Sequence, residues 1–268
     1  MVIDQVTRVG RRLAGRPRGA STDEDAVVRR VLDAMGVTTG AAVDIAACDG
    51  ITKSNTRALF RAGWGGLAVE GDPANFASLA RAYRSYTDVG LARVWVTPDN
   101  VAGLLRAYGV AREFDFLNLD IDGYDHFVLD ALLADYRPRV ISAEVNEKIP
   151  PPVRFTVRYD PDHAWSRDHF YGQSISTLAD LAARHDYALV ELSYNNAFLV
   201  PAEHNPLPAL TAEEAYRVGY LERPDRLRLF PWNEDMEPLH SLDTAGKLDF
   251  LRRYFAQYDG RYDLSAGE

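Results

Sequence analysis

The sequence predicts an α/β protein with a doubly wound, mostly parallel sheet, because apolar runs of strand length alternate with helical segments. The clearest unit has an apolar run at 41–47, a turn at Asp49-Gly50, a helical segment at 52–62 and a second apolar run that ends in Glu70. In a right-handed strand–helix–strand unit both strand ends open on the same crevice. We therefore expect Gly50 and Glu70 to lie side by side there.

The other elements continue the alternation. An amphipathic helix near residues 23–35 precedes the first strand, and a helix near 174–185 follows the parallel part. Residues 187–192 and 197–200 form a predicted hairpin, which would add an antiparallel edge. The remaining predicted helices are near 73–83, 101–108 and 126–134, and the remaining strands near 92–96, 114–121 and 139–145.

Composition shifts divide the chain into three parts. Residues 1–20 are rich in arginine and glycine, which predicts a flexible basic arm. Residues 21–201 form the Rossmann-like domain, with an insertion at 146–172 that is rich in proline and aromatic residues and lacks a regular pattern. Residues 202–268 form a predicted C-terminal helical extension, with helices near 212–221 and 242–258.

Composition also excludes several classes of function. The 268 residues are 47% hydrophobic, enough for a proper core, and the formal net charge of −9 argues against a nucleic-acid-binding surface. A single cysteine excludes an internal disulfide framework and a cysteine-based zinc site. No apolar run has the length of a membrane span. We expect a cytoplasmic protein that acts on a small molecule, without nucleic acid or membrane as partner; a homo-oligomer is compatible with the sequence.

The first crevice lacks the glycines of a dinucleotide fingerprint. Ala46 and Cys48 occupy two of those positions, and Asp49 would place a negative charge beside a phosphate. A cofactor with a ribose and no phosphate fits better, and S-adenosylmethionine is such a cofactor. Asp44 and Asp49 would then face its amino acid and sulfonium end, and Glu70 its ribose. In the alternative interpretation, Asp44 and Asp49 cap turns and Glu70 is a solvated strand end.

A second group of acids follows the fourth predicted strand of the sheet. Asp120, Asp122 and Asp125 lie within six residues, and Glu144 and Asn146 end the next strand. Crowded carboxylates repel one another unless a positive charge lies among them, and hard oxygen ligands favour Mg²⁺, Mn²⁺ or Ca²⁺. The alternative is that Asp122 and Asp125 cap the following helix while Asp120 belongs to an ion pair.

Several sequence blocks together resemble a known family. The chain is similar, from about residue 38 to 200, to class I S-adenosylmethionine-dependent methyltransferases of an FkbM-like branch. More distantly, the acidic block resembles metal-dependent sugar O-methyltransferases that act on macrolide and aminocoumarin antibiotics. The blocks that carry the resemblance are 44–52 with Ser54-Asn55-Thr56, Val69-Glu70, Val96-Thr97-Pro98-Asp99-Asn100-Val101, Leu119-Asp120-Ile121-Asp122-Gly123-Tyr124-Asp125, Arg137-Pro138-Arg139-Val140, Glu144-Val145-Asn146, Tyr159-Asp160-Pro161-Asp162, Trp165 and Tyr171-Gly172-Gln173-Ser174.

The resemblance implies roles for the acids. Asp120 would ligate Mg²⁺ and Asp122 would take the acceptor proton, with His126 as the competing base. The related enzymes carry an Asp-Asp pair at the next strand end, where this chain has Glu144-Val145-Asn146. Ala46 replaces the usual glycine of the cofactor motif, and its methyl group is compatible with binding.

The predicted function is S-adenosylmethionine-dependent O-methylation of a sugar, glycoside or other hydroxylated small molecule. Two alternatives remain open, an NAD-dependent oxidoreductase and a non-catalytic cofactor-binding module of the same fold. Asp99 and Asn100 would contact the adenine, or else cap the next helix. The predicted cofactor-binding residues are Asp44, Ala46, Asp49, Gly50, Glu70, Asp99, Asn100 and Asp120, and the predicted metal ligands are Asp120, Glu144 and Asn146.

Overall fold

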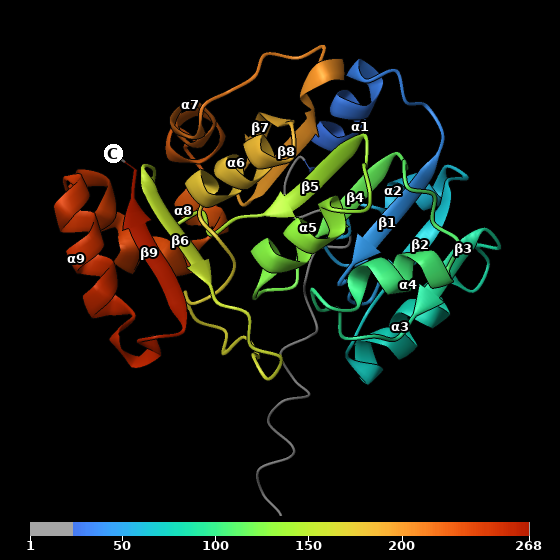
Figure 1. Ribbon diagram of the computed structural model, residues 1–268, viewed down its shortest axis with the longest axis horizontal. Coiled ribbons are helices and arrows are strands. Elements are labelled where there is room, and N and C mark those ends of the chain that lie inside the picture. Colours follow the sequence, from blue (N-terminus) through green and yellow to red (C-terminus); the bar gives the residue numbers. More distant parts are fainter. Residues whose placement is uncertain (1–23, 268) are drawn as a thin grey trace, which may run out of the picture.

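The computed structural model describes residues 24–267 and centres on one twisted sheet (Figure 1). The basic arm predicted at residues 1–20 therefore lies outside the described residues. Seven strands form the main sheet in the order β3-β2-β1-β4-β5-β8-β7. The strands are β1 (Ala41–Ile45), β2 (Gly65–Val69), β3 (Val89–Ala92), β4 (Phe116–Leu119), β5 (Val140–Glu144), β7 (Tyr187–Ser193) and β8 (Asn196–Pro201).

Strand pairing confirms the predicted sheet. β1 pairs in parallel with β2 and β4, with Ile45 opposite both Val69 and Leu119. β4 also pairs in parallel with β5, whereas β8 is antiparallel to both β5 and β7. The first five strands therefore end at one carboxyl edge, and the hairpin of β7 and β8 extends the sheet beside β5.

Helices cover both faces of the sheet, because the strand side chains alternate between two apolar clusters. Val43 and Ile45 contact the side that carries α4 (Val101–Ala107), α5 (Asp125–Leu133) and α6 (Ile175–Arg184). Ala42 contacts the side that carries α1 (Glu24–Ala34), α2 (Arg57–Arg61) and α3 (Pro73–Tyr83). None of the helices within residues 24–267 combines the length and apolar character needed to cross a bilayer.

A second, two-stranded sheet corrects the expectation of an irregular insertion and a purely helical extension. β6 (Val153–Val157) lies in the insertion and pairs antiparallel with β9 (Tyr262–Ala266) of the extension. Phe155 of β6 packs with residues of the extension in a third apolar cluster. The extension also contains η1 (Ala202–His204), α7 (Ala212–Tyr216), the π-helical η2 (Arg217–Leu221), α8 (Arg226–Leu229), η3 (Pro231–Ser241), α9 (Thr244–Tyr254) and η4 (Ala256–Tyr258).

Two elements near the cofactor loops differ clearly from their predicted bounds. The strand expected at 92–96 is β3 at Val89–Ala92, because its partner β2 ends at Val69 and later residues have no strand to pair with. The helix expected at 52–62 is reduced to α2, since the Asp49 carboxylate accepts hydrogen bonds from the backbone N–H groups of Ile51 and Thr52 (2.8 and 2.7 Å). These bonds hold the start of that segment in a turn.

Candidate functional site

The carboxyl edge of the sheet carries strained backbone. Ala46, Cys48 and Asp122 have φ angles of 68°, 49° and 54°, in the left-handed region that disfavours side chains. Such conformations cost about 1–3 kcal/mol each and concentrate at functional sites. Four of the seven non-glycine residues with positive φ in the described part of the chain, these three and Lys53, lie in the loops after β1 and β4, where sequence analysis predicted the cofactor and the metal. The other three are Arg167, Asp186 and Tyr194.

Glu70 joins the loops after β1 and β2. Its carboxylate accepts hydrogen bonds from the backbone N–H of Cys48 (2.8 Å) and of Asp72 (2.7 Å). Burial raises the pKa of Glu70, although these backbone bonds act in the opposite direction. Gly50, in the same β1 loop, has φ +70°, and an added Cβ there would lie 2.5 Å from Leu79 Cδ1. The structure thus brings this loop and Glu70 together.

Asp44 and Asp49 are both engaged by neighbouring side chains and backbone. Asp44 is fully buried and accepts hydrogen bonds from Thr56 Oγ1 (2.5 Å) and Asn118 Nδ2 (2.9 Å). Burial raises the pKa of Asp44. For Asp49, burial is outweighed by hydrogen bonds from Thr52 and Ile51, which lower its pKa. Asp49 therefore caps its own turn, and contact of either acid with the cofactor stays a prediction.

The loop after β3 holds Asn100 and Asp99. Asn100 accepts a hydrogen bond from Thr97 N (2.9 Å) and donates one to the Trp95 carbonyl (2.9 Å), and its side chain makes no cap bond to α4. Asp99 is exposed. Sequence analysis overlooked Trp95, a residue that is 68% exposed and whose ring lies where a Cβ on Gly71 would come within 2.3 Å. The ring therefore lies directly beside the residue that follows Glu70.

Three carboxyl groups meet at the ends of β4 and β5. Asp120, Asp122 and Glu144 each place an oxygen within 4.8 Å of the others. Burial, followed by the neighbouring acids, raises the pKa of Asp120 to about 6 and of Asp122 to about 8. The same causes raise the pKa of Glu144 well above its usual range. We call these three residues the acidic cluster.

Asp125 shapes the loop that carries the acidic cluster. Its carboxylate accepts hydrogen bonds from Ile121 N (2.8 Å) and Gly123 N (3.0 Å). Asp122 lies between these two donor residues, and its backbone has the positive φ angle noted above. Both donors precede α5, whose N-cap residue, Tyr124, makes no side-chain cap bond, so Asp125 stabilises the loop and does not cap the helix as in the alternative interpretation.

The donor set of the acidic cluster fits a hard divalent cation. Glu144 Oε1 accepts a hydrogen bond from Asn195 Nδ2 (2.9 Å), while Glu144 Oε2 is buried and receives no hydrogen bond from an N–H or hydroxyl group within residues 24–267. The Glu144 carboxyl group also shares a side-chain hydrogen bond with Asp120, which requires a proton between the two acids. Within the described residues, no lysine or arginine forms an ion pair with Asp120, Asp122 or Glu144. Crowded oxygen ligands with an unmatched buried oxygen are what Mg²⁺ or Ca²⁺ would satisfy.

The side-chain NH₂ group of Asn146 is hydrogen-bonded to the insertion. Its Nδ2 donates hydrogen bonds to the carbonyls of His169 (2.9 Å) and Tyr171 (3.0 Å). Its Oδ1 is buried without a hydrogen-bond partner among the described residues. The amide oxygen is therefore the atom of Asn146 that remains for the predicted role as a metal ligand.

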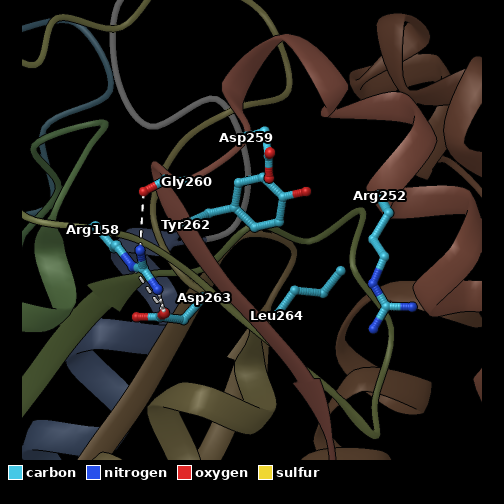
Figure 2. Close-up of a pocket in the computed structure, with 7 residues that line it drawn as sticks. All are labelled: Arg158, Arg252, Asp259, Gly260, Tyr262, Asp263 and Leu264. Atoms are coloured by element: carbon cyan, nitrogen blue, oxygen red, sulfur yellow. Dashed lines mark hydrogen bonds and ion pairs between the residues drawn. The ribbon is translucent and has the colours of Figure 1, made fainter.

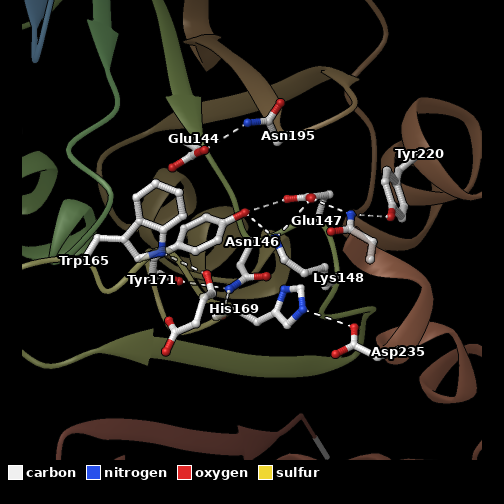
Figure 3. Close-up of polar contacts among 12 residues, drawn as sticks. Glu144, Asn146, Glu147, Lys148, Trp165, His169, Tyr171, Asn195, Tyr220 and Asp235 are labelled. Carbon is white, nitrogen blue, oxygen red and sulfur yellow. Dashed lines mark hydrogen bonds and ion pairs between the residues drawn. The ribbon is translucent and has the colours of Figure 1, made fainter. Parts of the chain in front are cut away.

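A buried polar network that sequence analysis missed follows Asn146 (Figure 3). Lys148 is 2% exposed, and its Nζ lies 3.1 Å from Glu147 Oε1 and bonds the Tyr171 hydroxyl. Glu147 also accepts hydrogen bonds from Tyr171 (2.9 Å) and from Asn233 Nδ2 (2.7 Å) of the extension. The network connects the segment after β5 with the insertion and the extension. Its signal in the sequence was the pair of adjacent charged residues, Glu147 and Lys148, shortly after a buried strand.

His126, predicted as the competing base, lies apart from the acidic cluster. Its Nδ1 contacts Gln173 Oε1 (3.0 Å) and its Nε2 contacts Arg184 (3.5 Å), which places the ring between α5 and α6. Burial lowers the pKa of His126. His163 of the insertion lies closer to the acid-bearing loop, because a Cβ on Gly123 would come within 2.9 Å of its ring. Of the two histidines, His163 is therefore the one beside Asp122.

A surface hollow of about 320 Å³ opens beside β9 (Figure 2). Arg158 donates hydrogen bonds to Asp263 Oδ1 (2.9 and 2.6 Å) and to the Gly260 carbonyl (3.0 Å), so its charge is matched. The hollow contains none of the predicted site residues. Its lining consists of Arg158, Arg252, Asp259, Gly260, Tyr262, Asp263 and Leu264.

The strand order defines the class of fold. The sheet is doubly wound, with β8 inserted antiparallel beside β5, which is the Rossmann-like arrangement that the sequence predicted. No family model and no curated protein matches the sequence.

Solved structures with a similar arrangement include several methyltransferases. The N-terminal domain of EvdMO1 with SAH bound is 14% identical, with a TM-score of 0.42 over 66% of this chain and 79% of that one. The methyltransferase domain of bacterial CtHen1-C is 12% identical, with a TM-score of 0.43 over 67% and 96%. A putative O-methyltransferase from Klebsiella pneumoniae is 12% identical, with a TM-score of 0.41 over 66% and 78%.

Proposed function

We propose that this protein is an S-adenosylmethionine-dependent O-methyltransferase that acts on a sugar, glycoside or other hydroxylated small molecule, with help from a divalent cation. One observation carries the proposal. The carboxyl edge places Glu70 against the β1 loop, and the acidic cluster at the ends of β4 and β5 on the same edge. A cofactor and an acceptor hydroxyl would meet between these two groups.

The cofactor side would be formed by the loops after β1, β2 and β3. S-adenosylmethionine, when bound, supplies an electrophilic methyl group. Glu70, already anchored by two backbone N–H groups, retains lone pairs for the ribose hydroxyls. Asp99 and Asn100 would lie toward the adenine, and Gly50 allows the turn to pass close to α3.

The acceptor side would be formed by the acidic cluster. Asp120 and Glu144, with Asn146 Oδ1, would hold the cation, which would lower the pKa of a coordinated hydroxyl. Asp122 would accept the proton of that hydroxyl. The pKa of Asp122 is raised to about 8 even with Lys53 and Lys148 acting to lower it, so the charge of a bound cation would be needed to ionise Asp122 at pH 7.

Aromatic side chains of the insertion support a sugar as the acceptor. Trp165 is 39% exposed, and its ring meets the edge of Tyr171 at 5.8 Å between centroids. A partly exposed indole offers an apolar face to the C–H groups of a sugar ring. We also propose that the protein is cytoplasmic and acts on a small molecule, as the composition of the sequence led us to expect. A homo-oligomer is compatible with this proposal.

The test is methyl transfer from labelled S-adenosylmethionine to a panel of sugars and glycosides, with Mg²⁺ and with EDTA. Asp122→Asn should lower turnover by about 10²–10⁴-fold while S-adenosylhomocysteine affinity is kept, because shape is preserved and the base is lost. Asp33→Asn, at an exposed position of α1, is the matched control and should retain activity.

Three outcomes would each reject a different part of the proposal. Full transfer in excess EDTA would reject the cation. Cofactor binding without transfer to any acceptor would favour the non-catalytic module. Calorimetric binding of NAD in place of S-adenosylmethionine would favour an oxidoreductase.

A further inference from the structure

The turn between β7 and β8 reaches into the acidic cluster from a distant part of the chain. Asn195 Nδ2 donates a 2.9 Å hydrogen bond to Glu144 Oε1 (Figure 3). The backbone carbonyl of the same residue accepts a 2.7 Å hydrogen bond from Val145 N. Asn195 therefore holds both the side chain of Glu144 and the backbone directly after it.

The extension holds this turn in place. Tyr194 N donates a hydrogen bond to the Gly219 carbonyl (3.0 Å), and the Tyr194 hydroxyl donates one to Asp225 Oδ1 (2.7 Å). Gly219 is required at that contact, because a Cβ there would lie 2.2 Å from the Leu192 carbonyl oxygen. A continuous set of contacts thus runs from the extension through the turn to Glu144.

The contact leaves the two oxygens of Glu144 in different states. Oε1 is occupied by the amide of Asn195, whereas Oε2 is buried and receives no hydrogen bond from an N–H or hydroxyl group within residues 24–267. The Glu144 and Asp120 carboxyl groups also share a side-chain hydrogen bond, which needs a proton between them that a cation would replace. Glu144 is only 6% exposed, so water does not supply the missing donor. An asparagine can hold the carboxylate without adding a fourth negative charge to Asp120, Asp122 and Glu144.

We propose that Asn195 is a positioning residue that fixes Glu144 with Oε2 directed to a bound divalent cation, and that the extension supports it through Tyr194. This inference rests on the cation of the proposed function. Partners that orient a metal ligand typically change metal affinity by about 10–100-fold when they are removed. Asn195 would act through Glu144, without contact to the cation itself.

The test is calorimetric titration of the full-length protein with Mn²⁺ alone, followed by titration with S-adenosylhomocysteine. Asn195→Ala should weaken Mn²⁺ binding about 10–100-fold and leave S-adenosylhomocysteine affinity within about twofold of wild type. Asn195→Leu keeps the branching at Cγ, in a larger side chain, and removes the donor; it should give the same result if the alanine variant does not fold. Asn205→Ala is the matched control, because Asn205 caps a turn through Leu207 N (2.8 Å) away from the cluster.

Mn²⁺ affinity that is equal in wild type and in both Asn195 variants would overturn the inference and leave the cation site intact. If wild type binds no Mn²⁺, the cation of the proposed function fails together with the inference. Tyr194→Phe removes the bond to Asp225 and should weaken Mn²⁺ binding by a smaller factor than Asn195→Ala. Unchanged Mn²⁺ affinity in the Tyr194→Phe variant would show that the bond between Tyr194 and Asp225 does not help to position Glu144.

Discussion

The acidic cluster should make the metal-free protein less stable as pH rises. Asp120 and Asp122 have pKa values near 3.8 in model compounds, and in the fold their pKa values are raised to about 6 and about 8. The unfolded chain releases these protons near pH 4, while the folded protein keeps them. Their stabilising contribution is therefore complete below about pH 4 and is lost as pH rises toward 8.

The size of the effect follows from the two pKa values. Each pH unit between the unfolded and folded pKa costs about 1.4 kcal/mol per retained proton. Asp120, Asp122 and Glu144 titrate together, so the loss between pH 5 and pH 8 belongs to the cluster as a whole and is on the order of a few kcal/mol. We expect the free energy of unfolding to fall by about 2–5 kcal/mol over this range in EDTA, and by less in Mg²⁺, which would bind the ionised acids.

Urea denaturation at pH 5 and pH 8 measures this difference directly. Asp122→Asn has no proton to retain, so in EDTA its stability should change less than that of wild type, while Asp33→Asn should follow wild type. If Asp122→Asn lost as much stability as wild type between the two pH values, the acidic cluster would not be the cause.

Three other predictions concern the loops around the cofactor site. Glu70→Ala should weaken S-adenosylhomocysteine binding by about 1.5–3 kcal/mol in calorimetry, since hydrogen bonds to a charged group are lost; an unchanged affinity would contradict the predicted ribose contact. Ala46→Gly should raise the free energy of unfolding by about 0.5–1 kcal/mol in urea, because glycine relieves a left-handed conformation; equal or lower stability would show that Ala46 carries no strain. With cofactor and acceptor present, hydrogen exchange should slow at residues 159–167, the exposed part of the insertion, and not in β6, which β9 already protects. Equal slowing throughout the insertion would indicate that it closes as one unit.

The sheet could be predicted because its signal is local. Apolar runs, turn residues and helical spacing each lie within about fifteen residues, and a right-handed crossover leaves few ways to connect them. β6 was missed for the opposite reason. Val153, Phe155 and Val157 alternate as a strand should, but the partner strand lies more than one hundred residues later, at Tyr262–Ala266. Prolines beside the segment concealed the pattern.

The candidate site shows the same division. The sequence places Asp120 and Glu144 at neighbouring strand ends, and the structure brings their oxygens together. The sequence alone could not show that Asn195 would contact Glu144, because the residues of a hairpin turn do not indicate which distant part of the chain they will contact. His126 was assigned by its closeness to Asp122 in sequence, but the direction of α5 turns its ring toward Gln173.

The pairing of β6 with β9 also determines the order in which parts of the protein can fold during synthesis. A ribosome that has released residues up to 201 has produced all seven strands of the main sheet, yet β6 still waits for residues 262–266. Bringing Val153 to Ala266 closes a loop whose entropy cost is about 4 kcal/mol. The insertion that carries Trp165 and Tyr171, proposed to contact the acceptor, would therefore be the last part of the site to form, and a nascent chain would form the cofactor side of the site before the acceptor side.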